Sequence, residues 1–184
     1  MNAPVSIESL ATRPASAFRA AMRQLASGVS VVTVGNSEDR TGLTITSLTS
    51  LSVEPPSLIV CVNRQASAWP LLLRHQVFGV NVLRAEQRDV AIRFSGEGKL
   101  TGAARFGDEP VIIAETGAPL LGNALAAFDC EAEALIDHHS HVIVIGRVKA
   151  VRAAERGTSL LYWRGQYCEA GAGESSAVTA RRGR

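Results

Sequence analysis

The sequence predicts a mainly β protein, an α+β chain built as an antiparallel barrel with a few peripheral helices. Short apolar or alternating segments follow one another closely, turns rather than long helices join them, and only three modest helical segments interrupt them. With 184 residues, 46% of them hydrophobic, the chain can close one core. We expect one domain over 14–168, after a flexible lead over 1–13 and before a disordered basic tail over 169–184.

The first expected elements are a helix and a hairpin. The helix is predicted over 14–28, because Gly28 suits a left-handed cap at its end. Its apolar face would be formed by Phe18, Met22 and Leu25. A strand over 29–34 follows, and a turn over 36–40 leads back into the next strand.

That next strand contains the segment 44–50, TITSLTS, in which five hydroxyl side chains interrupt an apolar alternation that runs from Leu43 to Val53. Hydroxyls and backbone N–H groups held on a rigid strand suit the edge of a planar heterocycle or the oxygens of a phosphate. A solvated strand rich in threonine, a good β-former, fits the pattern equally well. The segment therefore predicts either a ligand-facing or a solvent-facing strand.

The later elements follow from apolar runs and from alternation. In order, they are a buried strand over 57–62, a helix over 67–73 capped by Ser67, a strand over 77–82, a helix over 85–94 and a strand over 142–151. The glycine-rich segment 95–123 is expected to wrap the surface and to act as a lid. The strand over 128–136 alternates clearly, so Asp129, Glu131 and Glu133 are expected on one solvated or dimer-facing side.

Composition excludes several classes of protein. A net charge of +2 and an aromatic content of 5% argue against a nucleic-acid-binding surface. The three cysteines are widely spaced, which favours reduced thiols over a disulfide framework or a zinc site. The N-terminus lacks the pattern of a signal peptide, and no segment has the roughly 18 apolar residues of a membrane span. A soluble cytoplasmic protein is expected.

Common catalytic motifs are missing from the sequence. No Gly-x-Gly-x-x-Gly opens a helix, and no Gly-x-Ser-x-Gly is present. His138, His139 and His141 share one predicted turn, where their side chains would diverge, so no metal is expected. Either all three are solvated, or His141 points into a cleft. Residues 162–167, with two tyrosines, a tryptophan and an arginine, either stack on a ligand ring or pack on the core.

Taken together, these segments resemble the short-chain flavin reductase family, the reductase components of two-component flavin monooxygenases. The resemblance runs from Phe18 to Tyr167 in the family's order. It rests on GVSVVT, TITSLTSLSVEPPSLIVCVNR, VNVL, the Arg105-Phe106 pair, FDCE, HVIVIGRV and LLYWRGQY.

The resemblance implies an FMN-binding split β-barrel with a Greek-key core, a homodimer, and FMN or FAD bound at the dimer interface. The flavin-binding residues it implies are Thr44, Thr46, Ser47, Leu48, Thr49, Cys61, Val62, Asn63, Ser67, Ala68, Arg93 and Phe94. For the nicotinamide of NADH or NADPH it implies His141, Tyr162, Trp163, Arg164, Gly165 and Tyr167, with His141 as the catalytic residue. Members often carry an aspartate before this histidine and a threonine after the first phosphate-side serine. Ser140 and Ala68 stand in those places here.

The implied activity is hydride transfer from NADH or NADPH to FMN or FAD, with the reduced flavin supplied to a partner monooxygenase. Direct transfer between two aligned rings needs no nucleophile, carboxylate pair or metal. Two other functions stay open: a flavin carrier or store without pyridine-nucleotide turnover, suggested by Ser140, and a flavin oxidase acting on an amine.

Overall fold

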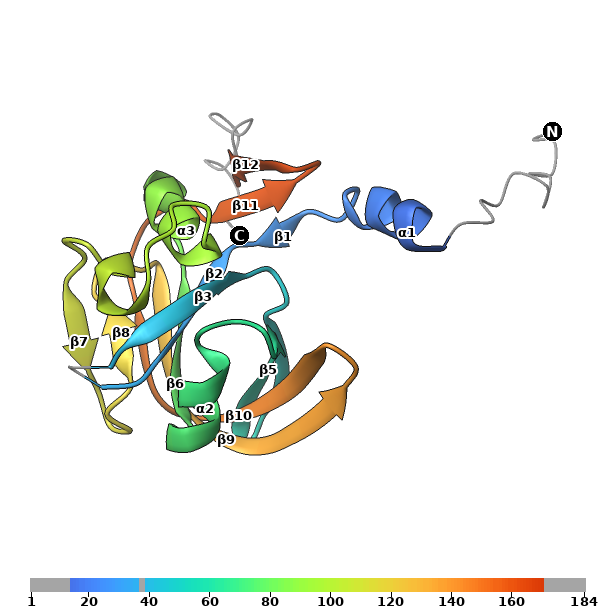
Figure 1. The fold of residues 1–184 in the computed structure, drawn as a ribbon. Coiled ribbons are helices and arrows are strands. Elements are labelled where there is room, and N and C mark those ends of the chain that lie inside the picture. The colour runs from blue at the N-terminus through green and yellow to red at the C-terminus, as the bar shows by residue number, and fades with distance from the viewer. Residues whose placement is uncertain (1–13, 37–38, 171–184) are drawn as a thin grey trace, which may run out of the picture.

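In the computed structural model, which describes residues 14–36 and 39–170, the chain folds around one large antiparallel sheet (Figure 1). Its seven strands lie in the order β3-β2-β6-β9-β10-β5-β4. They are β2 (Ser30–Val34), β3 (Thr41–Ile45), β4 (Thr49–Val53), β5 (Pro56–Asn63), β6 (Val77–Val82), β9 (Ala126–His138) and β10 (His141–Ala153). The prediction of a mainly antiparallel β protein is confirmed. The lead over 1–13 and the tail beyond 170 lie outside the described residues.

The described residues include three helices. They are α1 (Pro14–Met22), α2 (Trp69–His75) and α3 (Arg88–Ser95), with 3-10 turns η2 (Ala85–Gln87) and η3 (Gly102–Arg105). Helix α2 packs against β2 and β6, and α3 packs against β3. Helix α2 has Ala68 at its N-cap and no side-chain capping bond, so the predicted capping role of Ser67 is wrong. Pro70 lies in the first turn of α2, where a missing N–H costs least, and the helix forms there without a hydroxyl cap.

Two apolar clusters hold the fold together. The first fills the inside of the curled sheet with fully buried side chains such as Val60, Phe78 and Val144. The second lies beneath α3, where the Phe94 and Phe106 rings meet edge to face with their centroids 5.1 Å apart. Helix α3 is thereby fixed against β3, whose end borders the site described below.

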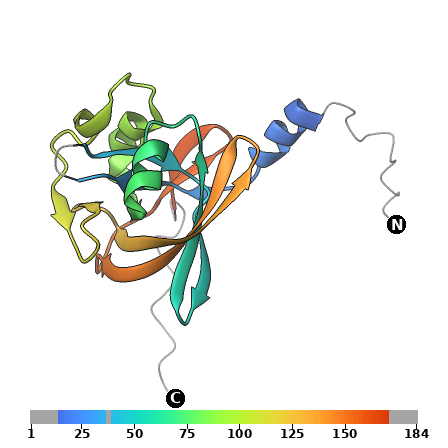
Figure 2. The same ribbon diagram turned by 60° about the horizontal axis from the view of Figure 1, so that its bottom comes forward.

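The hydroxyl-rich segment is two strands and not the single strand predicted. Strand β3 ends at Ile45 and β4 begins at Thr49, with a bend over 46–48 between them. The strands diverge because β3 pairs with β2 at one edge of the sheet and β4 pairs with β5 at the other. The β4–β5 hairpin then extends away from the barrel (Figure 2).

The first helix is shorter than predicted. It ends at Met22, and Gly28 lies in the short strand β1 (Ser27–Gly28) instead of capping a helix. Strand β1 pairs with β11 (Leu160–Trp163), which pairs with β12 (Gln166–Glu169) to form a separate three-stranded sheet. Pairing with β11 draws the chain into an extended path, and α1 projects away from the barrel (Figure 1). Its predicted apolar face of Phe18, Met22 and Leu25 is exposed in this chain.

The segment 95–123 forms a strap over the sheet and contains the hairpin of β7 (Val111–Ile113) and β8 (Pro119–Leu121). This strap covers the outward side of β9, so the prediction that Asp129 is solvated with Glu131 and Glu133 is wrong for Asp129. Its carboxylate is fully buried and accepts hydrogen bonds from the backbone N–H and the hydroxyl of Thr116. Glu131 and Glu133 are exposed as predicted.

Candidate functional site

A groove runs along the end of β3, formed by three adjoining hollows that share lining residues. The first, here called the Arg105 end, has a volume of about 440 Å³. The middle hollow, the tyrosine section, has about 250 Å³ and shares Thr44 and Ser95 with the Arg105 end. The third, the Arg23 end, has about 200 Å³ and shares Thr46 and Tyr162 with the tyrosine section. Alternate residues of the hydroxyl-rich segment therefore join all three hollows.

The Arg105 end is the polar part of the groove. Its lining residues are Leu43, Thr44, Asn63, Gln65, Ala66, Ser67, Phe94, Ser95 and Arg105. The guanidinium of Arg105 is held by donating to the Gly42 carbonyl from Nη1, at 2.6 Å, and to the Leu100 carbonyl from Nε, at 2.9 Å. Burial lowers the pKa of Arg105 from its ordinary 12.5, and an arginine still remains charged at neutral pH. This end therefore offers hydroxyl, amide and guanidinium donors suited to a phosphate.

The tyrosine section offers aromatic surface. Tyr162 on β11 and Tyr167 on β12 face each other across the hairpin, with ring centroids 5.2 Å apart. The other residues that line this section are Val29, Thr44, Ile45, Thr46, Ser95 and Glu97. The pKa of Tyr167 is raised, chiefly because the phenol is partly desolvated by burial. A planar ring bound here would have phenol rings and threonine side chains around it.

Three of the predicted hydroxyl ligands, Thr44, Ser47 and Thr49, are already engaged by the backbone. The Thr49 hydroxyl donates to the Ser50 carbonyl at 3.4 Å. The Thr44 hydroxyl donates to the Ala91 carbonyl at 2.7 Å, which ties β3 to α3. The Ser47 hydroxyl accepts from the Cys61 N–H at 3.0 Å and lies 3.3 Å from the Cys61 carbonyl, to which it donates. Thr46 is exposed and, within the described residues, its hydroxyl makes no hydrogen bond with the chain. Thr46 is thus the hydroxyl of this segment best placed to meet a ligand in the groove.

The groove brings together half of the predicted site residues. Those that line it are Thr44, Thr46, Asn63, Ser67, Phe94, Tyr162, Arg164, Gly165 and Tyr167. Those that do not line it are Ser47, Leu48, Thr49, Cys61, Val62, Ala68, Arg93, Trp163 and His141. For the residues of both groups, assignment to flavin or nicotinamide binding stays a prediction.

The residues outside the groove have other surroundings. Val62 and Ala68 are fully buried in the core, whereas Leu48 and Thr49 line an apolar hollow elsewhere. Arg93 donates to the carbonyls of Arg105 and Phe106, so it holds the strap. Trp163 donates from its indole nitrogen to the Gln24 carbonyl at 3.2 Å.

His141 lies at the border of the Arg105 end. It begins β10, directly opposite Asn63 in the register of β5, and Asn63 lines the groove. Its side chain is exposed, and Nδ1 lies 2.9 Å from the Ser140 hydroxyl. Ser140 therefore contacts the imidazole nitrogen at the place where an aspartate was expected from the family. In the described part of the chain, no three His, Cys, Asp or Glu side chains are grouped as a metal site would need.

Arg105 was not predicted as a site residue, although the Arg105-Phe106 pair was noted in the sequence. Its role depends on the Gly42 carbonyl, 63 residues away, and no local pattern marks such a contact. Arg23 was missed for a different reason: the sequence placed it inside a helix over 14–28, whereas α1 ends at Met22.

Among the described residues, the helices are too short or too polar to span a membrane.

Comparison with known proteins gives a consistent result. A family model described as "Flavin reductase like domain" matches residues 22–171. An FMN reductase (NADH) RutF 2 of Methylorubrum extorquens is 42% identical over 151 residues, covering 80% of this chain and 85% of that protein. The reductase component of a FADH(2)-dependent resorcinol hydroxylase from Rhizobium sp. is 36% identical over 156 residues, covering 83% and 86%.

A solved structure extends the likeness to three dimensions. The Streptomyces globisporus NADH:FAD oxidoreductase SgcE6, in complex with NAD and FAD fragments, superimposes with a TM-score of 0.77. The two chains are 28% identical, and the match covers 87% of this chain and 96% of that one. The similarity therefore spans nearly all of the part of the chain that the structure describes.

Proposed function

The chain belongs to the flavin reductase-like domain family, and from this premise we propose that it transfers a hydride from NADH to FMN or FAD. The reduced flavin would then pass to a separate oxygenase component, as the name of the resorcinol hydroxylase reductase indicates for that relative. NADPH is an alternative donor.

The observation that carries this proposal is the composition of the groove. A flavin mononucleotide has a planar ring system, a polar ribityl chain and a phosphate. The tyrosine section supplies ring-stacking surface beside Thr46, and the Arg105 end supplies Ser67, Gln65 and the Arg105 guanidinium for an anion. Polar and aromatic groups thus follow one another in the order in which such a molecule would need them. The residues present fit the flavin.

The chemistry assigned to the chain's own residues is modest. A bound flavin supplies the atom that accepts the hydride. The protein has to hold two rings face to face at a short separation and to exclude water from between them. Tyr162 and Tyr167 would orient the stacked rings, while hydrogen bonds from the Arg105 end would fix the distal phosphate. Proton transfer by a side chain is not needed for the hydride step.

Steady-state turnover tests the proposal. NADH and NADPH are each measured against FMN, FAD and riboflavin, and flavin is expected to stimulate oxidation of at least one donor strongly. Absence of stimulation by all three flavins would reject the reductase function. A tightly bound yellow flavin that neither donor reduces would favour a flavin carrier instead.

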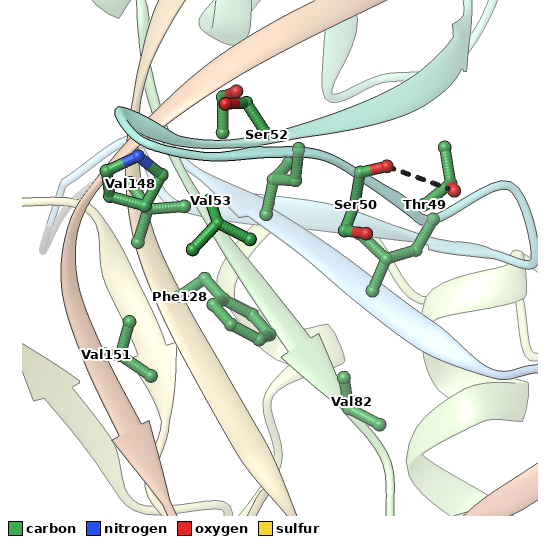
Figure 3. A pocket seen from close by; sticks show the side chains of 12 residues that line it. Thr49, Ser50, Ser52, Val53, Val82, Phe128, Val148 and Val151 are labelled. Carbon is green, nitrogen blue, oxygen red and sulfur yellow. Dashed lines mark hydrogen bonds between the residues drawn. The ribbon is translucent and has the colours of Figure 1, made fainter.

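We further propose that the protein acts as a homodimer, because two apolar surfaces stay uncovered in one chain. One is a hollow of about 400 Å³ between the β4–β5 hairpin and strands β9 and β10, where Val53, Phe128 and Val148 converge (Figure 3). Val53 is 90% exposed, and the surrounding surface is largely apolar. The other is the exposed apolar surface of Phe18 and Met22 on α1, a helix that projects away from the barrel (Figure 1). A second copy is the partner that would cover such surfaces permanently.

The oligomeric state is tested with Val53→Asp, which places a charge in the apolar hollow. We expect the wild type to sediment as a dimer and the variant to shift toward the monomer. Glu54→Ala, the adjacent exposed residue, serves as the matched control. A wild type that sediments as a monomer at all concentrations would overturn this part of the proposal.

A further inference from the structure

The Arg23 end of the groove combines two guanidinium-bearing residues with an apolar floor. Its lining residues are Met22, Arg23, Leu25, Ser27, Thr46, Tyr162, Arg164 and Gly165. None of these is acidic, so no carboxylate among the lining residues neutralises the two arginines. The hollow shares Thr46 and Tyr162 with the tyrosine section, and a molecule stacked on Tyr162 could therefore extend directly into it.

Backbone and side-chain bonds hold this hollow in shape. The Arg164 N–H donates to the Arg23 carbonyl at 3.0 Å, and Arg164 Nε donates to Gln24 Oε1 at 3.2 Å. The Arg164 guanidinium also lies over the Trp163 ring, 4.6 Å from its centroid. The segment after α1 is thereby fastened to the β11–β12 hairpin, and Arg164 is held in place before any ligand arrives.

The Arg23 side chain has no such structural task. It is exposed, and within the described residues its guanidinium makes no hydrogen bond or ion pair with the chain. Its hydrogen bonds in the described residues are made by the backbone: its N–H donates to the Arg19 carbonyl, and its carbonyl accepts from Arg164. A positively charged side chain at the rim of a hollow, beside a second arginine that is already fixed, is the arrangement expected for binding an anion.

We propose that the Arg23 end binds a phosphate of an adenine dinucleotide whose ring-bearing half lies in the tyrosine section. The proposal rests on the function proposed above and assigns the opposite ends of the groove to different anions. Arg105 would hold the phosphate next to the flavin's ribityl chain, and Arg23 with Arg164 would hold a phosphate about one ring system further along. The dinucleotide is the donor, NADH, because the two phosphates of FAD are bonded to one another through a single oxygen and do not reach opposite ends of the groove. FMN carries no second phosphate to reach this end.

The test compares Arg23→Gln with the matched control Arg19→Gln, which removes an exposed arginine one turn earlier on α1 that does not line the hollow. KM is measured for NADH with FMN as acceptor, and for FMN and FAD with NADH in excess. If the donor's phosphate binds here, KM for NADH rises about tenfold in Arg23→Gln, in line with the loss of a charged hydrogen bond, and KM for FMN does not. A rise in KM for FAD with KM for NADH unchanged would overturn the assignment, because it would place the pyrophosphate of FAD, and not that of the donor, at this end.

Equal KM values in Arg23→Gln and wild type for all three nucleotides, or an equal rise for FMN, would overturn the inference. A control pair, a phosphate-free dihydronicotinamide with riboflavin, tests the proposed reductase function separately from the phosphate site. Turnover of this pair by the wild type needs no phosphate site, so it shows that hydride transfer occurs even where the Arg23 inference fails. The selectivity of wild type for NADH over the phosphate-free donor should also fall about tenfold in Arg23→Gln. Selectivity that is unchanged, despite normal wild-type turnover of both donors, would refute the phosphate site alone.

Discussion

The hydroxyl of Ser47 bonds both backbone polar groups of Cys61, accepting from its N–H at 3.0 Å and donating to its carbonyl at 3.3 Å. This pair joins the bend after β3 to the middle of β5, on the opposite side of the curled sheet. The backbone of β5 would otherwise lack a partner at this point on that edge. The contact therefore holds the groove wall in position without itself lining the groove.

Ser47→Ala should lower the free energy of unfolding by about 1 kcal/mol, because it leaves two partly buried backbone groups of Cys61 without a side-chain partner. Chemical denaturation of the purified protein measures this change. Ser50→Ala is the matched control, since Ser50 is exposed and lies three residues further along. A variant as stable as the control would show that water replaces the Ser47 hydroxyl at no cost.

Thr46→Val should weaken FMN binding about fivefold, corresponding to roughly 1 kcal/mol for one hydrogen bond, and leave thermal stability unchanged. Thr46 lines two sections of the groove, and its hydroxyl is not used by the described chain. Titration of flavin fluorescence measures the dissociation constant. Thr49→Val is the informative comparison, because Thr49 lines the apolar hollow instead. A larger loss from Thr49 than from Thr46 would place the flavin elsewhere.

His141→Ala should raise KM for the nicotinamide donor more than KM for the flavin. His141 borders the groove beside Asn63 without lining it, and the resemblance assigns it to the nicotinamide donor. Steady-state kinetics with each substrate varied in turn provide the comparison. His139→Ala, on the same exposed turn, controls for a general effect of removing an imidazole. Equal increases for donor and flavin would contradict the assigned role.

Asp129→Ala should cost about 2–3 kcal/mol of unfolding free energy, because the part-buried N–H of Thr116 loses a charged acceptor that lies 2.7 Å away. Glu131→Ala, two residues along the same strand, should change stability by less than about 0.5 kcal/mol, since its pairing with Lys149 is solvent-exposed. Differential scanning calorimetry of both variants gives the contrast. Similar losses in the two variants would mean that the strap is not fastened through Asp129.

Tyr167 should titrate at a pH above the ordinary phenol pKa of 10.0, because partial burial raises its pKa. The folded protein then keeps this proton where the unfolded chain has lost it. The contribution of Tyr167 to stability is accordingly complete below pH 10.0 and is lost as pH rises through the folded pKa. The chain has two tyrosines, so an ultraviolet phenolate titration of Tyr162→Phe reports Tyr167 alone. Titration below 10.0 would contradict the partly buried position.

Strands with uniform local patterns were predictable from sequence. The apolar run that forms β5 and the run that forms β6 were expected within one or two residues of their observed bounds. A strand buried on both sides needs little more than a continuous apolar segment between turns, and both segments supply it. Local composition therefore determined these elements.

Elements that depend on distant partners were not predictable in the same way. The alternation around Asp129 correctly put it on the outward side of β9, but the strap that covers this side begins more than ten residues earlier. The bend over 46–48 arises because β3 and β4 pair with strands at opposite edges of one sheet. For the site, hydroxyl spacing indicated the segment that borders the groove but not which hydroxyls the backbone already uses. Only the fold distinguishes Ser47 from Thr46.

The two walls of the groove belong to different sheets: β3 to the seven-stranded sheet, and Tyr162 and Tyr167 to the small three-stranded one. We therefore expect sequence changes in the β11–β12 hairpin to alter nucleotide choice with little effect on the main hydrophobic core. Relatives with different donors or acceptors would be expected to diverge first in this hairpin. For protein engineering, the β11–β12 hairpin is a segment that could be replaced to change cofactor preference while the rest of the fold is retained.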